Sequence, residues 1–150
     1  MRGLARYPRV WERYLEPLGV LNLGVGGDRT EHVQWRVANG EVPKCMKYAV
    51  IHCGSNNIGR NRPREISDSL LDIGETFLDA RPNSYIFIHG IIPRDMSPFS
   101  CRRARIREVN MLVRSECNLR DRFVYIEPAS EFCGPGGYLN EELRADLHTD

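Results

Sequence analysis

The chain has 150 residues, 41% hydrophobic and 27% charged, which suits one soluble domain with a real core. Its 21 basic and 20 acidic residues leave a net charge of +1, so no overall field favours nucleic acid or a membrane surface. The five scattered cysteines form no C-x-x-C pair, no signal-peptide pattern opens the chain, and no run of about 18 apolar residues would span a membrane, so we expect a cytoplasmic protein with reduced thiols.

Strand-like and helix-like runs alternate along the chain. Strands are expected at Val20–Leu23, Tyr48–Cys53, Tyr85–His89 and Phe123–Ile126. Helical stripes lie over residues 10–15, 30–37, 63–81 and 106–117. This alternation predicts right-handed βαβ units, a parallel sheet and helices on both of its faces. Because no repeat or linker interrupts the pattern, we expect residues 1–150 to form a single three-layer α/β/α domain.

The loops that follow the first two expected strands carry the residues best suited to chemistry. The first loop reads Asn22-Leu-Gly-Val-Gly-Gly-Asp-Arg-Thr30, and the second reads His52-Cys-Gly-Ser-Asn-Asn57. Open parallel sheets bind ligands in loops at the carboxyl ends of their strands. The backbone N–H of Gly27 and the carboxamide of Asn56 are donors of the kind that form an oxyanion hole.

Other functions fit these loops less well. A dinucleotide fingerprint needs a small residue where Arg29 stands and an acidic residue at the end of the next strand, where the chain reads Cys53-Gly54. A nucleophile elbow needs glycines on both sides of Ser55, where Cys53 and Asn57 stand instead. The four histidines show no metal-ligand spacing, so we expect no metal and no cofactor.

These loops resemble the second and third conserved blocks of the SGNH (GDSL-like) hydrolases, most closely the intracellular platelet-activating-factor acetylhydrolase type. The resemblance extends in the family's order over Trp11–Arg13, Leu21–Thr30, His32–Arg36, Asn39–Glu41, Gly54–Asn57, Ile91–Arg94 and Val109–Asn110. It implies a flavodoxin-like sheet and hydrolysis of small acyl esters by a Ser–His–Asp triad. Gly27 and Asn56 match the family's oxyanion-hole residues, and Asp28 is expected to support the glycine loop.

The chain departs from the family at two other blocks, Gly-Asp-Ser at the start and Asp-x-x-His near the end. The chain has no strand ending in Gly-Asp-Ser, and alignment at Trp11 places that serine directly ahead of Met1. We therefore expect a domain incomplete at both ends, with its first strand and its nucleophile outside the chain. At the other end Asp150 is the expected triad aspartate, with the histidine beyond it. The alternative pairs Asp146 with His148, although this spacing is one residue short of Asp-x-x-His.

The resemblance leaves two functions open. The first is an esterase domain for a small acyl-ester substrate, of which this chain alone would perform little triad chemistry. The second is a non-catalytic module of the same fold, for example a degenerate or retrotransposon-encoded esterase domain, that dimerises or binds a partner. A missing first strand would leave a sheet edge unpaired, so we expect marginal stability or association, such as a homodimer, through that edge.

Overall fold

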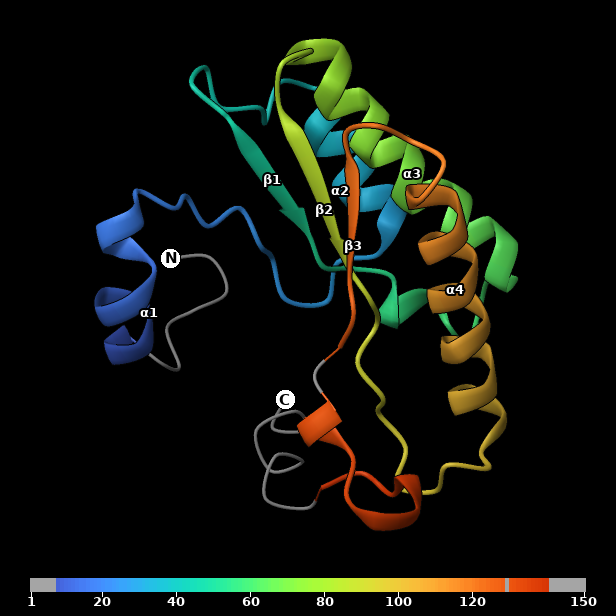
Figure 1. Ribbon diagram of the computed structural model, residues 1–150. Helices are drawn as coiled ribbons and strands as arrows, with labels where there is room; N and C mark the ends of the chain where they lie inside the picture. The colour runs from blue at the N-terminus through green and yellow to red at the C-terminus, as the bar shows by residue number, and fades with distance from the viewer. Residues whose placement is uncertain (1–7, 129, 141–150) are drawn as a thin grey trace.

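Three short parallel strands form the centre of the protein (Figure 1). The computed structural model describes residues 8–128 and 130–140. Strand β1 (Tyr48–Ile51) pairs with β2 (Tyr85–His89), which pairs in turn with β3 (Phe123–Ile126). The predicted α/β fold with a parallel sheet flanked by helices is therefore confirmed.

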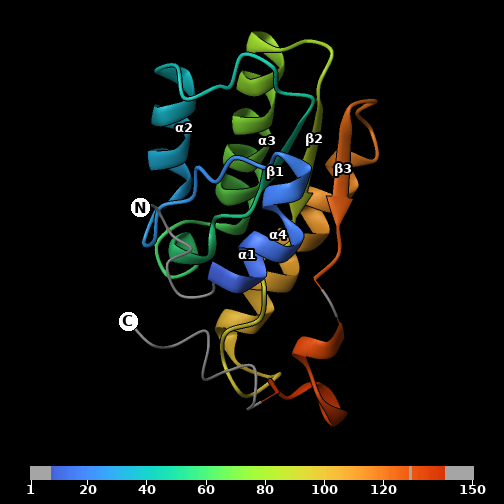
Figure 2. The ribbon, with the colours of Figure 1, turned by 90° about the vertical axis from the view of Figure 1, so that its left-hand side faces the viewer.

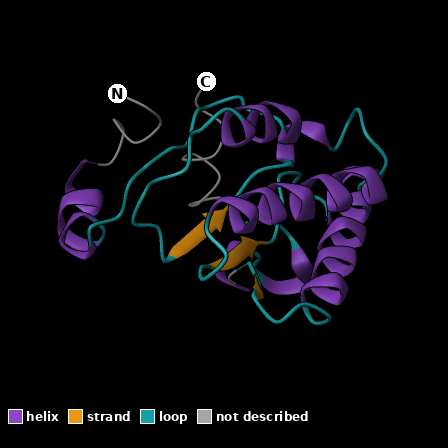
Figure 3. Cartoon of the chain, turned by 90° about the horizontal axis from the view of Figure 1, so that it is seen from above, coloured by secondary structure: helices purple, strands orange, loops and turns teal. Residues whose placement is uncertain are grey.

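Among the described residues the helices that connect the strands cover one face of the sheet, where the sequence pattern predicted helices on both faces. The helices are α1 (Pro8–Tyr14), α2 (Thr30–Ala38), α3 (Pro63–Ala80) and α4 (Cys101–Cys117), with 3-10 turns η1 (Glu16–Leu18), η2 (Ser55–Asn57), η3 (Ser130–Phe132) and η4 (Pro135–Gly137). Helix α3 packs between α2 and α4, and the three lie together on one side of the strands (Figures 1 and 3). Helix α1 contacts η1 and lies apart from them, beyond β1 (Figures 1 and 2). No helix within the described ranges is long and apolar enough to cross a membrane.

The core lies between the sheet and these three helices. Side chains alternate along a strand, so Ala49 and Ile51 of β1 are buried while Tyr48 and Val50 are 65% and 67% exposed. The predicted stripe of α3 meets the buried face, and its four members Ile66, Leu70, Ile73 and Phe77 are all buried. Gly74 lets α3 approach closely, because a Cβ there would lie 2.4 Å from the ring of Phe123.

The elements differ from the predictions most at β1, at α4 and at the first expected strand. Strand β1 ends at Ile51, two residues before the predicted Cys53. Helix α4 begins at Cys101, ahead of its apolar stripe, because the Ser100 hydroxyl accepts a hydrogen bond from the Arg103 N–H at 3.1 Å. The predicted strand Val20–Leu23 is wrong, since this segment belongs to no sheet. An apolar run becomes a strand only when a neighbouring strand bonds to its backbone. Among the described strands, β1 is the edge of the sheet and pairs only with β2, so no strand bonds to Val20–Leu23.

Candidate active site

The two predicted loops meet at the carboxyl end of β1. The Asn56 side-chain amide, in η2, donates a hydrogen bond to the carbonyl of Asp28 at 2.9 Å, across 28 residues of sequence. The neighbouring Gly27 has a φ of 81°, a left-handed conformation that favours glycine. The structure thus places the Asn56 carboxamide beside the glycine loop, as the expected pairing of Gly27 with Asn56 requires.

The next residue, Asn57, fastens η2 to the start of α2. Its Oδ1 accepts the Thr30 N–H at 3.1 Å, while its Nδ2 donates to Glu31 Oε2 and to Asn61 Oδ1, both at 3.0 Å. Asn57 and Thr30 are 1% and 2% exposed, so their polar groups depend on these protein partners and not on water. Asn57 therefore sets the position of the glycine loop relative to Asn56.

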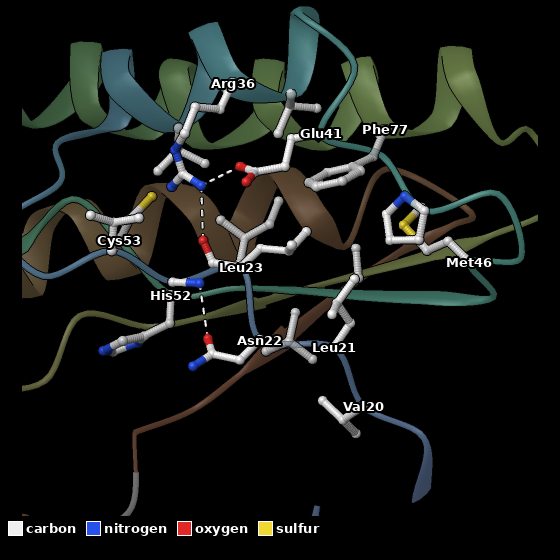
Figure 4. Close-up of a pocket in the computed structure, with 18 of the residues that line it drawn as sticks. Val20, Leu21, Asn22, Leu23, Arg36, Glu41, Met46, His52, Cys53 and Phe77 are labelled. Carbon is white, nitrogen blue, oxygen red and sulfur yellow. Dashed lines mark hydrogen bonds and ion pairs between the residues drawn. The ribbon is translucent and has the colours of Figure 1, made fainter. Parts of the chain in front are cut away.

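Asp28 supports the loop through an ion pair with α2. Its Oδ2 lies 2.5 Å from Nη2 of Arg36. Nη1 of the same guanidinium donates to the carbonyl of Leu23 at 2.8 Å and to the carboxylate of Glu41. Figure 4 shows Arg36 reaching toward both Glu41 and Leu23. One guanidinium thus holds the chain before and after the glycines, as its fork of donors permits.

Arg94, from the loop after β2, orients the Asn56 amide. Its Nη1 donates to Ser55 Oγ at 3.0 Å and lies 3.4 Å from Asn56 Oδ1. The carbonyl end of the amide therefore faces Arg94, and the NH₂ end faces the glycine loop. A carboxamide nitrogen carries two hydrogens, and only one is used on Asp28 among the described residues. The second hydrogen is available to a ligand.

The turn that carries Asn56 requires a glycine at its start. Gly54 has a φ of 97°, and a Cβ there would lie 3.1 Å from Ile66 and 3.2 Å from Ile91. A larger residue would meet both the backbone strain and the side chains of the core. Gly54 thus permits η2 to turn tightly over the end of the sheet.

A cavity of about 880 Å³ adjoins these loops, which we call the β1 cavity. Residues 18–28 line one side, residues 45–56 line the other, and side chains such as Val37 and Phe77 complete its wall. Figure 4 shows Leu21, Met46 and Phe77 around it, with polar groups toward the loop end. A largely apolar cavity with a few convergent polar groups is the usual form of a small-molecule site.

Neither nearby side chain with nucleophilic potential is activated. Burial, together with the Asp28 carboxylate, raises the pKa of Cys53 to about 12, so its thiol stays protonated near neutral pH. The Ser55 hydroxyl accepts from Arg94, a cation that cannot remove its proton. The described loops therefore provide donors for a negative charge rather than an attacking group.

The remaining predicted residues fall elsewhere. Asp150, and the alternative pair of Asp146 with His148, lie outside the described residues. Within the described ranges, no three histidine, cysteine or carboxylate side chains cluster around a metal position. The sequence assigned no role to Asn57, Arg36 or Arg94, and the one available signal was their position within the segments that resemble the SGNH hydrolases.

Glu31 gives the site a testable dependence on pH. A backbone hydrogen bond at the start of α2, followed by the Asn57 amide, lowers the pKa of Glu31 below its ordinary value of 4.5. The ionised Glu31 carboxylate therefore stabilises the folded state above pH 4.5, and this contribution is lost as the pH falls through the lower folded-state pKa. We expect Glu31→Gln to lower the urea midpoint at pH 6 and to leave it nearly unchanged at pH 3. Glu12→Gln on α1 is the control, and an equal effect of Glu31→Gln at both pH values would contradict this origin.

Comparison with known proteins places the chain in a family. The model of the GDSL-like Lipase/Acylhydrolase family matches residues 1–150. The chain is 34% identical to human platelet-activating factor acetylhydrolase IB subunit alpha1 over 141 residues, covering 93% of this chain and 60% of that protein. It is 36% identical to the Drosophila melanogaster platelet-activating factor acetylhydrolase IB subunit beta homolog over 102 residues, covering 66% of this chain and 45% of that protein.

The fold agrees with this assignment. A solved structure described as a platelet activating factor from Streptococcus pneumonia superimposes with a TM-score of 0.64 over 91% of this chain and 75% of that chain, at 16% identity. The chain spans about half the length of the curated relatives it matches, between 45% and 60%. By its sequence over its whole length, the chain belongs to the GDSL-like lipase/acylhydrolase family, a family of ester hydrolases.

Proposed function

We propose that this chain carries the oxyanion hole of an esterase that hydrolyses small acyl esters, with the Gly27 N–H and the Asn56 Nδ2 as its donors. The observation that carries the proposal is the Asn56 amide, whose NH₂ group donates to the Asp28 carbonyl in the glycine loop while Arg94 lies beside its oxygen. Attack on an ester carbonyl moves negative charge onto its oxygen. Donors already fixed in place stabilise that charge without reorganising during the reaction.

In the complete reaction, a serine attacks the carbonyl carbon while a histidine takes the serine's proton. We assign the aspartate that orients this histidine to Asp150, with Asp146 and His148 as the alternative pair. The histidine then returns the proton to the leaving alcohol, and water releases the acyl group by the same steps.

We propose that the serine comes from a strand outside these 150 residues that pairs with β1. In a parallel ladder alternate residues face the partner strand, and the Lys47 carbonyl already faces β2. The N–H and C=O groups of Tyr48 and Val50 therefore face outward, toward the β1 cavity. A strand inserted there would satisfy these groups and would end beside Gly27 and Asn56, since parallel strands end at the same edge of the sheet.

The test compares the 150-residue chain with a completed version, which has a strand ending in Gly-Asp-Ser ahead of Met1 and a histidine three residues after Asp150. We expect the completed version to hydrolyse p-nitrophenyl acetate and to unfold at a higher urea concentration, while the shorter chain shows little turnover. Equal urea midpoints would rule out strand insertion. A raised midpoint without turnover would rule out the esterase, and robust turnover by the shorter chain would rule out an external nucleophile.

The exposed sheet face supports a second candidate function, a non-catalytic module that associates through β1. Tyr48 and Val50 are among its most exposed apolar residues, at the strand that lacks an outer neighbour among the described residues. This function predicts a homodimer in sedimentation experiments and no turnover by the completed version. A monomeric, active completed version would exclude it.

A further inference from the structure

Two histidines meet at the carboxyl ends of β1 and β2, on the sheet face opposite α3. Ile51 pairs with Ile88 in the parallel register, so His52 and His89 are the next residues across from one another. Their Nδ1 atoms lie 3.1 Å apart and their rings are nearly perpendicular, with centroids at 4.8 Å. His89 Nδ1 also lies 2.7 Å from the carbonyl oxygen of Gly90. We call these three atoms the histidine trio.

The three atoms of the histidine trio share a single hydrogen. A carbonyl oxygen only accepts, so the close contact with Gly90 requires the hydrogen on Nδ1 of His89. The same hydrogen must then serve the contact with His52 Nδ1, which accepts. One hydrogen therefore lies among two ring nitrogens and one carbonyl oxygen, each of which has a lone pair that can bind a metal ion.

We propose that the histidine trio binds a divalent cation of the Zn²⁺, Ni²⁺ or Cu²⁺ class through the Nδ1 atoms of His52 and His89. Imidazole nitrogens bind such ions at about 2.0–2.1 Å, and two of them at an angle of 90–109° are about 2.9–3.4 Å apart. The observed separation of 3.1 Å falls within that range. The cation displaces the shared proton from Nδ1 of His89, and a proton is taken up at Nε2 of the same ring, so the exchange releases no net proton to water.

The surroundings determine the other ligands of this cation. The Gly90 carbonyl is the nearest further donor, and water fills the remaining positions, because no third histidine, cysteine or carboxylate among the described residues joins the cluster. Cys53 follows His52 directly, yet Figure 4 shows its side chain pointing the opposite way. His52 lines the β1 cavity, so the cation has access from that side. The proposal does not depend on esterase activity.

The experiment is calorimetric titration of the 150-residue chain with NiCl₂ and with ZnCl₂ at pH 7.5. The chain carries Cys45→Ser and Cys101→Ser, because these two thiols are exposed and bind the same ions. We expect one equivalent to bind with a micromolar dissociation constant. His52→Gln and His89→Gln should each weaken binding by at least about tenfold, while His32→Gln, which removes an exposed histidine outside the trio, should not.

A second measurement on the chain with both histidines intact avoids any effect of substitution on folding. Nitrogen-15 NMR of the imidazoles distinguishes the two ring nitrogens, and Zn²⁺ should shift Nδ1 of both His52 and His89 and leave Nε2 protonated. Coordination through Nε2, the absence of binding, or binding of equal strength in both glutamine variants would each overturn the proposal.

Discussion

Replacement of Asn56 by alanine should lower kcat for ester hydrolysis by about 10²- to 10³-fold in the completed protein. The substitution removes the carboxamide hydrogen that is left for the oxyanion after the bond to Asp28. Charge develops on that oxygen mainly in the transition state, so kcat should fall far more than KM rises. Steady-state kinetics with p-nitrophenyl acetate measures both.

The control for this prediction is Asn118→Ala, which removes an exposed carboxamide at the end of α4, far from the loops in sequence. It should leave kcat unchanged. Asn56 is itself exposed, so its removal should change the urea midpoint little. A fall in kcat of less than about threefold, far below the loss usual for such a donor, would exclude Asn56 from the oxyanion hole.

Replacement of Asn57 by alanine should lower the free energy of unfolding by about 3 kcal/mol, a large part of the stability of a small domain. The loss has two sources. The buried N–H of Thr30 is left without its acceptor, and the hydrogen bonds to Glu31 and Asn61 disappear. Each buried polar group left unsatisfied costs about 1–3 kcal/mol. Urea unfolding at pH 7 measures the change.

Asn61→Ala is the matched control for Asn57. It removes one of the same hydrogen bonds but leaves the Thr30 N–H satisfied, so it should cost less than about 1.5 kcal/mol. If the two substitutions destabilise the protein equally, the Thr30 contact is not the source of the loss. In the completed protein Asn57→Ala should also lower kcat, because the glycine loop is then no longer held at a fixed distance from Asn56.

The elements that could be predicted from the sequence are those with a local cause. The spacing of Ile66, Leu70, Ile73 and Phe77 marks one side of a helix whatever it packs against, and α3 forms there. The run Val20–Leu23 has the composition of a strand and yet forms none. Its conformation depends on a backbone partner that no local pattern supplies.

The candidate site likewise has one part that the sequence predicted and one part that it did not. Gly27 and Asn56 were predicted to lie together because loops after parallel strands share one edge of the sheet, and the loops do meet. Nothing in the sequence assigned Asn57 to Thr30, Arg36 to Asp28, or Arg94 to Asn56. These pairs join distant elements, and each of the side chains has several other partners that its chemistry would accept.

By itself, the sequence determined the family, the α/β class, the four helices and the two loops that carry the donors, because motifs and periodicity are properties of neighbouring residues. The tertiary structure alone decided which side chains fix those donors, and it placed His52 against His89. Their spacing of 37 residues matches no metal-ligand pattern in the sequence. The register of β1 and β2 makes them neighbours, and register is set by the packing of whole strands on a common core.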